Sequence, residues 1–110
     1  MALAQFAHIP VFAALADPMR RGILITLAES SPKTATQLSA NFPITRQGVL
    51  KHLRILQEAG LIAVQRQGRE MQFELKPEPL SEVDAFVKAV EAKWDARLLR
   101  LKAFVESGKV

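Results

Sequence analysis

The sequence contains no cysteine and no tyrosine, and it has only two histidines, His8 and His52. Without cysteine the chain can form neither disulfides nor thiolate metal sites, and this composition fits a cytoplasmic protein. The histidines stand far apart, and the sequence has no serine–histidine–aspartate pattern and no glycine-rich phosphate loop. We therefore expect no catalytic residues and no enzymatic activity.

Long hydrophobic runs are absent too. None approaches the roughly 20 apolar residues of a membrane span, and the apolar start lacks the basic residues of a signal peptide. What is present suits one folded domain of 110 residues, with 49% hydrophobic and 24% charged residues. Lys and Arg number 15 against 11 Asp and Glu, and this net charge of +4 favours polyanionic partners. We predict a single domain over residues 1–110 with no membrane contact.

Residues 44–60 are the stretch around which the rest of the chain is organised, and they predict a helix over 45–59. Thr45 is the expected N-cap, since its hydroxyl can accept a hydrogen bond from a free N–H of the first turn. Gly60 is the expected left-handed stop. The apolar side chains of this helix gather on one face, which we expect in the core: Val49, Leu53, Leu56 and Ala59.

The opposite face of this predicted helix is polar and mostly basic. It carries Gln47, Lys51, Arg54 and Glu58, and Arg46 lies on the flank near the N-terminus. Arginine, glutamine and lysine are side chains that pair with guanine, adenine and phosphate. A solvated surface helix would show the same face, so the neighbouring segments must distinguish the two interpretations.

Three shorter helices are predicted before it, over residues 9–16, 18–29 and 35–41. Asp17 can cap the second, and Thr34 with Gln37 forms a capping-box pattern that opens the third. Only a few residues join the third helix to the fourth, which is typical of a helix-turn-helix whose second helix enters the major groove. This arrangement favours DNA binding by Thr45, Arg46, Gln47, Lys51 and Arg54. We expect Arg46, Gln47 and Lys51 to read bases and Arg54 to hold phosphate.

After the predicted fourth helix the hydrophobic period becomes that of strands. Apolar residues alternate over 62–64 and again over 71–75, and Gly68 between them can take the positive φ of a tight turn. We predict a two-stranded hairpin that acts as a wing on phosphate or the minor groove through Arg66, Gln67 and Arg69. An ordinary hairpin with soluble tip residues is the alternative. Five cations oppose one carboxylate over residues 45–69, a local excess that equals the net charge of +4 of the whole chain.

A final helix is predicted from Leu80 to Val105, after two prolines that block further strand pairing. It would be about 40 Å long, against a radius of gyration of about 13 Å for a compact domain of this size. One domain can hardly cover so long an apolar stripe, so we predict a homodimer; packing within one chain is the alternative. The helices and wing would span 9–76 and the dimerisation helix 79–106. The expected interface residues are Phe12, Leu80, Val83, Val87, Val90, Trp94, Leu98 and Leu101.

Two motifs at this spacing resemble the ArsR/SmtB family of winged-helix repressors. The first is Ala14-Leu15-Ala16-Asp17-Pro18 with Arg20-Arg21 and Ile23-Leu24, and the second is Thr45-Arg46-Gln47 with Val49, Lys51-His52-Leu53, Leu56 and Ala59-Gly60-Leu61, followed by Arg66, Gly68 and Arg69. The resemblance covers about residues 11–105. It implies a mainly α fold with a small β-hairpin wing, and a homodimeric transcriptional regulator of prokaryotic type, which we expect to be a repressor. The partner would be a dyad-symmetric operator in double-stranded DNA. The resemblance also implies that a ligand often triggers release in this family, and the sequence identifies neither an effector nor whether this chain has one.

The chain departs from the metal-sensing members of that family. Those carry cysteines in the third helix, or histidines and carboxylates in the last helix. Here the segment 35–41 has no thiolate, and the last helix has Asp84, Glu91 and Asp95 but no histidine. Because scattered carboxylates make a poor site for thiolate- and imidazole-seeking metals, we place the chain in a subgroup that senses no metal and needs no cofactor. His8 and His52 are the only residues left that could recruit zinc.

Three positions in the predicted recognition helix have open roles. Leu50 stands where many relatives have a small hydroxyl residue, and it can contact either a thymine methyl or an apolar edge of the third helix. Gly48 weakens the helix by about 1 kcal/mol against alanine but permits close approach to phosphate. For His52 we expect core packing or a structural hydrogen bond in preference to a DNA contact.

A second class of function also fits the predicted shape. A winged-helix chain that has lost DNA binding could use its apolar last helix to bind a different protein. The location of the basic residues argues against this alternative, because the excess positive charge falls on the segments predicted to face DNA.

Overall fold

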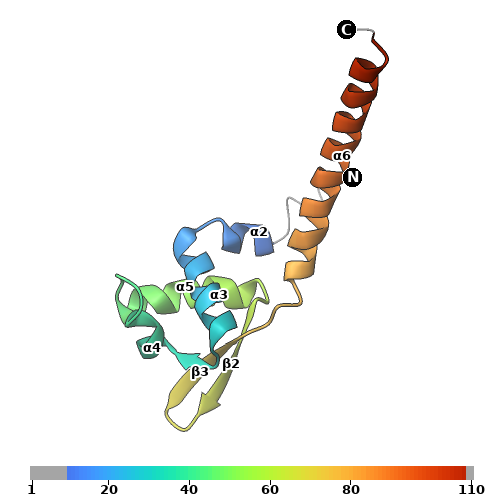
Figure 1. The fold of residues 1–110 in the computed structure, drawn as a ribbon. Coiled ribbons are helices and arrows are strands. Elements are labelled where there is room, and N and C mark those ends of the chain that lie inside the picture. Colours follow the sequence, from blue (N-terminus) through green and yellow to red (C-terminus); the bar gives the residue numbers. More distant parts are fainter. Residues whose placement is uncertain (1–9, 109–110) are drawn as a thin grey trace. The chain divides into compact units, whose positions relative to one another are not determined.

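The computed structural model describes residues 10–108, which divide into one unit up to Leu80 and another from Ser81. In the described residues, the first unit holds four helices and three strands, and the second is almost entirely helix α6 (Figure 1). The elements in chain order are α2 (Pro10–Leu15), α3 (Pro18–Glu29), β1 (Lys33–Thr34), α4 (Ala35–Ser39), α5 (Arg46–Glu58), β2 (Ile62–Gln67), β3 (Glu70–Leu75) and α6 (Leu80–Glu106). The predicted fold, mainly α with a small β-hairpin wing, is confirmed.

Side-chain caps determine where the helices of the first unit begin. Asp17 accepts a hydrogen bond from the backbone N–H of Arg20 at 3.1 Å, so α3 starts directly after it. Thr34 and Gln37 form the predicted reciprocal capping box, with bonds of 3.1 and 2.8 Å, at the start of α4. Each cap satisfies first-turn N–H groups that have no partner within the helix, which confirms these predicted starts.

The core of the first unit lies where α3, α4 and α5 meet. The predicted apolar face of α5 is confirmed, since Val49, Leu53, Leu56 and Ala59 are all buried. The largest fully buried side chains come from the three helices and from the segment between α5 and β2: Ile23, Leu27, Leu38, Val49, Leu53, Leu56 and Leu61. Removing any one of them would leave a cavity costing about 2–5 kcal/mol, so α5 is held firmly against the body of this unit.

The wing is a three-stranded antiparallel sheet in the order β1-β3-β2. The predicted hairpin is confirmed, with β2 and β3 paired from Ile62↔Leu75 to Gln67↔Glu70. Strand β1 was not predicted, and it pairs Lys33 with Phe73 on the free edge of β3. A two-residue strand is too short to show an alternating pattern, which is why the sequence gives no sign of it.

Some helix boundaries differ from those predicted. Helix α4 ends at Ser39 and not at residue 41, because Ala40 caps it and Asn41 already belongs to a turn. The nearby Pro43 disfavours helical backbone at the residue before it and so leaves no room for a longer helix. Helix α2 spans Pro10–Leu15, and the predicted start at residue 9, like His8, lies outside the described residues.

Helix α6 forms the second unit and spans 27 residues. Its described side chains include no buried residue, and its apolar stripe is about half exposed, for example Val90 at 52% and Trp94 at 56%. Two i,i+4 ion pairs, Lys88–Asp84 and Lys102–Glu106, lie on its surface. Over residues 10–108, no helix is both long and apolar enough to cross a membrane.

Candidate nucleic-acid interface

Helix α5 begins with a cap that leaves its first turn open to solvent. Thr45 has an extended backbone, and its hydroxyl accepts a hydrogen bond from the N–H of Gly48 at 3.0 Å, as predicted. The helix ladder starts with the bond from Val49 N–H to the carbonyl of Thr45. The N–H groups of Arg46 and Gln47 therefore have no helical acceptor and give this end a partial positive charge.

The outer face of α5 is polar and exposed. Gln47, Lys51 and Arg54 are all exposed, and together with the half-buried Leu50 they line a shallow hollow of about 330 Å³, which we call the outer hollow. Because the apolar face of the same helix is buried, these three polar side chains must point away from the core. This outward face is the surface that a major groove would meet.

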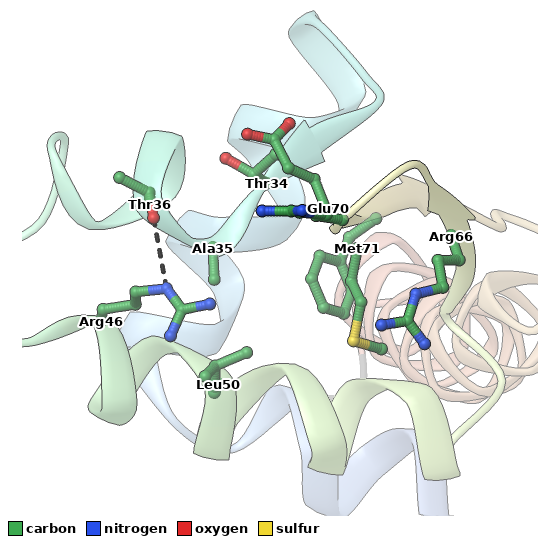
Figure 2. Close-up of a pocket in the computed structure, with 10 residues that line it drawn as sticks. Thr34, Ala35, Thr36, Arg46, Leu50, Arg66, Glu70 and Met71 are labelled. Carbon is green, nitrogen blue, oxygen red and sulfur yellow. Dashed lines mark hydrogen bonds between the residues drawn. The ribbon is translucent and has the colours of Figure 1, made fainter.

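Arg46 points in a different direction from its neighbours on α5. Its Nε donates to the hydroxyl of Thr36 on α4 at 3.2 Å, as the dashed line in Figure 2 shows. This bond directs the guanidinium into a second hollow of about 290 Å³ between α4, α5 and the wing, which we call the wing hollow. Thr36 was not predicted as a site residue, since only the folded chain brings it next to Arg46.

The wing supplies two more arginines to the wing hollow. Arg66 on β2 and Arg69 at the hairpin tip line it together with Arg46. The tip turns through Gly68, whose φ is +65°, a value that costs glycine nothing. Arg66, Gln67 and Arg69 are all exposed, as a contact with DNA requires. The predicted wing residues thus lie on the same unit as the exposed face of α5.

The cations of this surface are not neutralised within the unit. The ion pairs found over residues 10–108 are Lys76–Glu74, Lys88–Asp84 and Lys102–Glu106, and none involves a cation of α5 or the hairpin tip. Glu70 is the one carboxylate that lines the wing hollow. Five exposed and unpaired cations remain available to phosphate groups: Arg46, Lys51, Arg54, Arg66 and Arg69.

An arginine of the first motif connects α2 to the recognition helix. Arg20 donates through Nε to the carbonyl of Ala14 at 2.7 Å and through Nη2 to that of Ala13 at 3.2 Å. Its Nη1 lies 3.3 Å from Nδ1 of His52 on α5. Arg21 caps the same end of α2 through the carbonyl of Leu15 at 2.8 Å. The two arginines therefore satisfy the last carbonyls of α2, where cations are favoured.

His52 makes a structural hydrogen bond, as predicted from the sequence. Arginine has no acceptor atom, so Nδ1 of His52 must accept from Arg20 and the ring proton sits on Nε2. The backbone N–H of Arg20 also holds the pKa of Asp17 below its ordinary value, and the positive charge of Arg20 acts in the same direction. These contacts fix α5 against the start of α3.

Metal binding has no ready donor set in the described part of the chain. Over residues 10–108 no group of three or more histidine, cysteine, aspartate or glutamate side chains lies close enough to hold a metal ion. His52 has its Nδ1 engaged with Arg20, which leaves one ring nitrogen. The absence of a metal and of a cofactor stays a prediction.

Comparison with known proteins identifies relatives of this chain. Residues 15–65 match a helix-turn-helix domain family. The chain is 37% identical over 76 residues to an uncharacterised HTH-type transcriptional regulator, YuzN, of Bacillus subtilis. The aligned residues make up 64% of this chain and 83% of the relative. It is 35% identical over 65 residues to the transcriptional repressor SdpR of Bacillus subtilis, covering 59% and 71% of the two chains.

A solved structure is similar over nearly the whole length. An ArsR-like transcriptional regulator from Rhodococcus sp. RHA1 superimposes with a TM-score of 0.81 at 33% identity, covering 97% of this chain and 98% of that one. The winged fold, the helix-turn-helix match and the regulator relatives agree with the exposed cationic surface of α5 and the wing. The chain therefore belongs to the ArsR family of winged helix-turn-helix, DNA-binding transcriptional regulators.

Proposed function

We propose that two copies of this chain bind a two-fold symmetric operator in double-stranded DNA and thereby repress transcription. The observation that carries the DNA part is the set of five exposed, unpaired cations on α5 and the wing. Such cations gain free energy by displacing the counterions condensed on DNA phosphates. Repression is supported by similarity to a relative named as a repressor.

Each residue of the candidate DNA-binding surface has an expected role on DNA. Thr45 and the first-turn N–H groups of α5 would hold a phosphate, as helix N-termini do. Gln47 and Lys51, exposed on the outer face, would read base edges, and so would Arg46 at the flank. The remaining residues would hold the sugar-phosphate backbone: Arg54, Arg66, Gln67 and Arg69. Binding, and not catalysis, is then the whole activity, and it would take place in the cytoplasm, where the chromosome of a prokaryote lies.

The homodimer is proposed from the surface of α6. Its stripe leaves large apolar side chains about half exposed, including Val87 at 44% and Leu98 at 47%. A contiguous apolar surface of this kind marks a protein interface. A second α6 carries the same stripe and can cover it in a two-fold arrangement. The interface would comprise Leu80, Val83, Val87, Val90, Trp94, Leu98 and Leu101, with the half-buried Phe12 of α2.

A two-fold dimer makes a geometric prediction about the operator. Its two recognition helices should enter successive major grooves about 34 Å apart, so the half-sites should be related by dyad symmetry. Selection of bound fragments from a random pool of duplexes tests this directly. We expect a two-fold symmetric consensus with half-sites about one helical turn apart. A pool that stays random after selection would refute DNA recognition.

Sedimentation of the purified chain tests the other half of the proposal. We expect a dimer in the absence of DNA. A clean monomer would overturn the homodimer and would favour a protein-interaction module that uses α6 for a different partner. The selection and the sedimentation can fail independently, so they separate the DNA contact from the dimer contact.

A further inference from the structure

One aliphatic side chain lies in the middle of the cationic surface. Leu50 is half-buried, and it is the only apolar member of the outer hollow, whose other lining residues are Gln47, Lys51 and Arg54. It lies at the edge of the packed face of α5, and it is more exposed than Val49 and Leu53, which are at most 1% exposed. One side of Leu50 therefore borders the core, and the other side is part of the surface of the unit.

A second apolar side chain approaches Leu50 from the wing. Met71 on β3 is 49% exposed and lines the wing hollow together with Leu50. Figure 2 shows Leu50 rising from α5 and Met71 descending toward α5 from the wing, with Arg46 on one side and Arg66 on the other. A small apolar site thus stands between cations that we expect to hold DNA.

The location of Leu50 decides between its two possible contacts. It lines the wing hollow beside Ala35 of α4, but it also lines the outer hollow with Gln47, the expected base reader. Since Leu50 belongs to both hollows, an α4 neighbour does not cover its outward side. The side chain can reach the floor of a major groove that the outer face enters.

The major groove offers a single apolar group at base edges, the C5 methyl of thymine. Leucine has no hydrogen-bonding atom, so a cytosine amino group or a guanine oxygen opposite it would lose its water without gaining a partner. We infer that Leu50 is a specificity-determining residue that reads a thymine methyl group in each half-site. This inference rests on the proposed function and adds a base identity to it.

The experiment removes only the methyl group. The probe is the duplex that the wild-type dimer selects from the random pool, with each thymine in turn replaced by deoxyuridine. We expect one thymine per half-site to be sensitive, its replacement weakening wild-type binding about fourfold, the factor expected for burying one methyl group. In Leu50→Ala the parent duplex binds more weakly and the thymine-to-uracil ratio at that position falls to about one.

Matched controls separate this role from general packing. Met71→Ala removes the neighbouring apolar side chain, and we expect it to weaken thymine and uracil duplexes equally. Gln47→Ala should keep the methyl dependence while losing a different base preference. Thermal unfolding of Leu50→Ala should be lowered less than that of Leu53→Ala, because Leu50 is half-buried whereas Leu53 is 1% exposed.

The outcomes are distinct. If no deoxyuridine replacement weakens wild-type binding, or if the weakening survives in Leu50→Ala, the assignment is wrong. It is equally wrong if the methyl dependence disappears in Met71→Ala alone. If the wild-type chain selects no sequence, the proposed function falls and this assignment falls with it. Methyl dependence abolished only by Leu50→Ala supports both.

Discussion

Helices α5 and α6 are both amphipathic, but the fold uses their two faces in opposite ways. The apolar face of α5 is buried, with Val49, Leu53 and Leu56 at most 1% exposed. The apolar face of α6 stays accessible, with Trp94 at 56%. Burial of apolar surface contributes about 25 cal/mol per Å² of free energy. In α5 this contribution stabilises the folded unit, whereas in α6 it becomes available only when a partner covers the apolar face.

The two helices also differ in net charge. Helix α6 carries five basic and five acidic residues, whereas α5 carries three basic residues against Glu58 alone. On α6, Lys88 and Lys102 have carboxylate partners one turn away, at 2.9 and 3.9 Å. On α5, Lys51 and Arg54 belong to none of the ion pairs found over residues 10–108. An exposed apolar face is typical of a protein–protein interface, whereas a cationic face without ion-pair partners favours binding to a polyanion. We therefore propose a different partner for each of the two helices.

The largest expected effect comes from placing a charge on the open face of α6. Trp94→Glu should convert the dimer to a monomer and weaken operator binding at least about 100-fold, because the second half-site no longer adds an intramolecular contact. Sedimentation and fluorescence anisotropy with the selected duplex measure the two effects. Ala92→Glu, on the opposite face of α6, is the matched control and should change neither. A Trp94→Glu chain that stays dimeric would contradict the proposal that the apolar face of α6 forms the dimer interface.

The next effect concerns the outer face of α5. Gln47→Ala should relax the preference at one base position, with a loss of about 1–3 kcal/mol in discrimination against the wrong base. A repeated random-pool selection with this variant measures the change. An unchanged consensus would show that Gln47 reads no base.

A smaller effect is expected at the wing. Arg69→Ala should weaken binding to all sequences about equally and reduce the salt slope by about one per protomer, since a phosphate contact carries no sequence information. Anisotropy titrations over a range of salt concentrations provide the slope. Lys76→Ala is the control, because Lys76 already pairs with Glu74 at 3.4 Å. Equal slopes for Arg69→Ala and the wild type would exclude Arg69 from the phosphate contacts.

A substitution at Gly48 tests whether this glycine lowers the stability of α5 but allows its backbone to approach DNA closely. A Cβ added there would lie 3.4 Å from the hydroxyl of Thr45 and 3.6 Å from Cβ of Ile44, so the space admits alanine with little adjustment. Gly48→Ala should raise the free energy of unfolding by about 0.5–1 kcal/mol and weaken DNA binding severalfold. Urea unfolding at a fixed dimer concentration and anisotropy measure the two quantities. A variant that improves both would show that close backbone approach is not needed.

The smallest effect is predicted for the paired cations of α6. The side chain of Asp84 accepts a hydrogen bond from Lys88 and raises the pKa of that amine, so Lys88 keeps its positive charge to a higher pH. Lys88→Ala should leave the salt slope of DNA binding unchanged and alter thermal unfolding only slightly. A slope reduced by about one, as expected for Arg69→Ala, would show that α6 also contacts phosphate.

Local signals in the sequence predicted the elements of this chain well. The caps at Asp17, Thr34 and Thr45 act between residues three apart, so a short window contains all that they need. Strand β1 was missed because its pairing with β3 depends on residues about forty positions away. The direction of Arg46 was not predictable either, since Thr36 reaches it only after α4 and α5 have packed.

The amino-acid sequence by itself determined where the helices and hairpin lie, which face of α5 enters the core, and that the excess positive charge falls on α5 and the wing. These properties follow from periodicity and capping, which act over a few residues. Only the tertiary structure decided that Arg20 joins α2 to His52, that Arg46 turns toward the wing, and that Leu50 and Met71 line one hollow. Those contacts join residues distant in sequence, and their geometry depends on how whole helices pack.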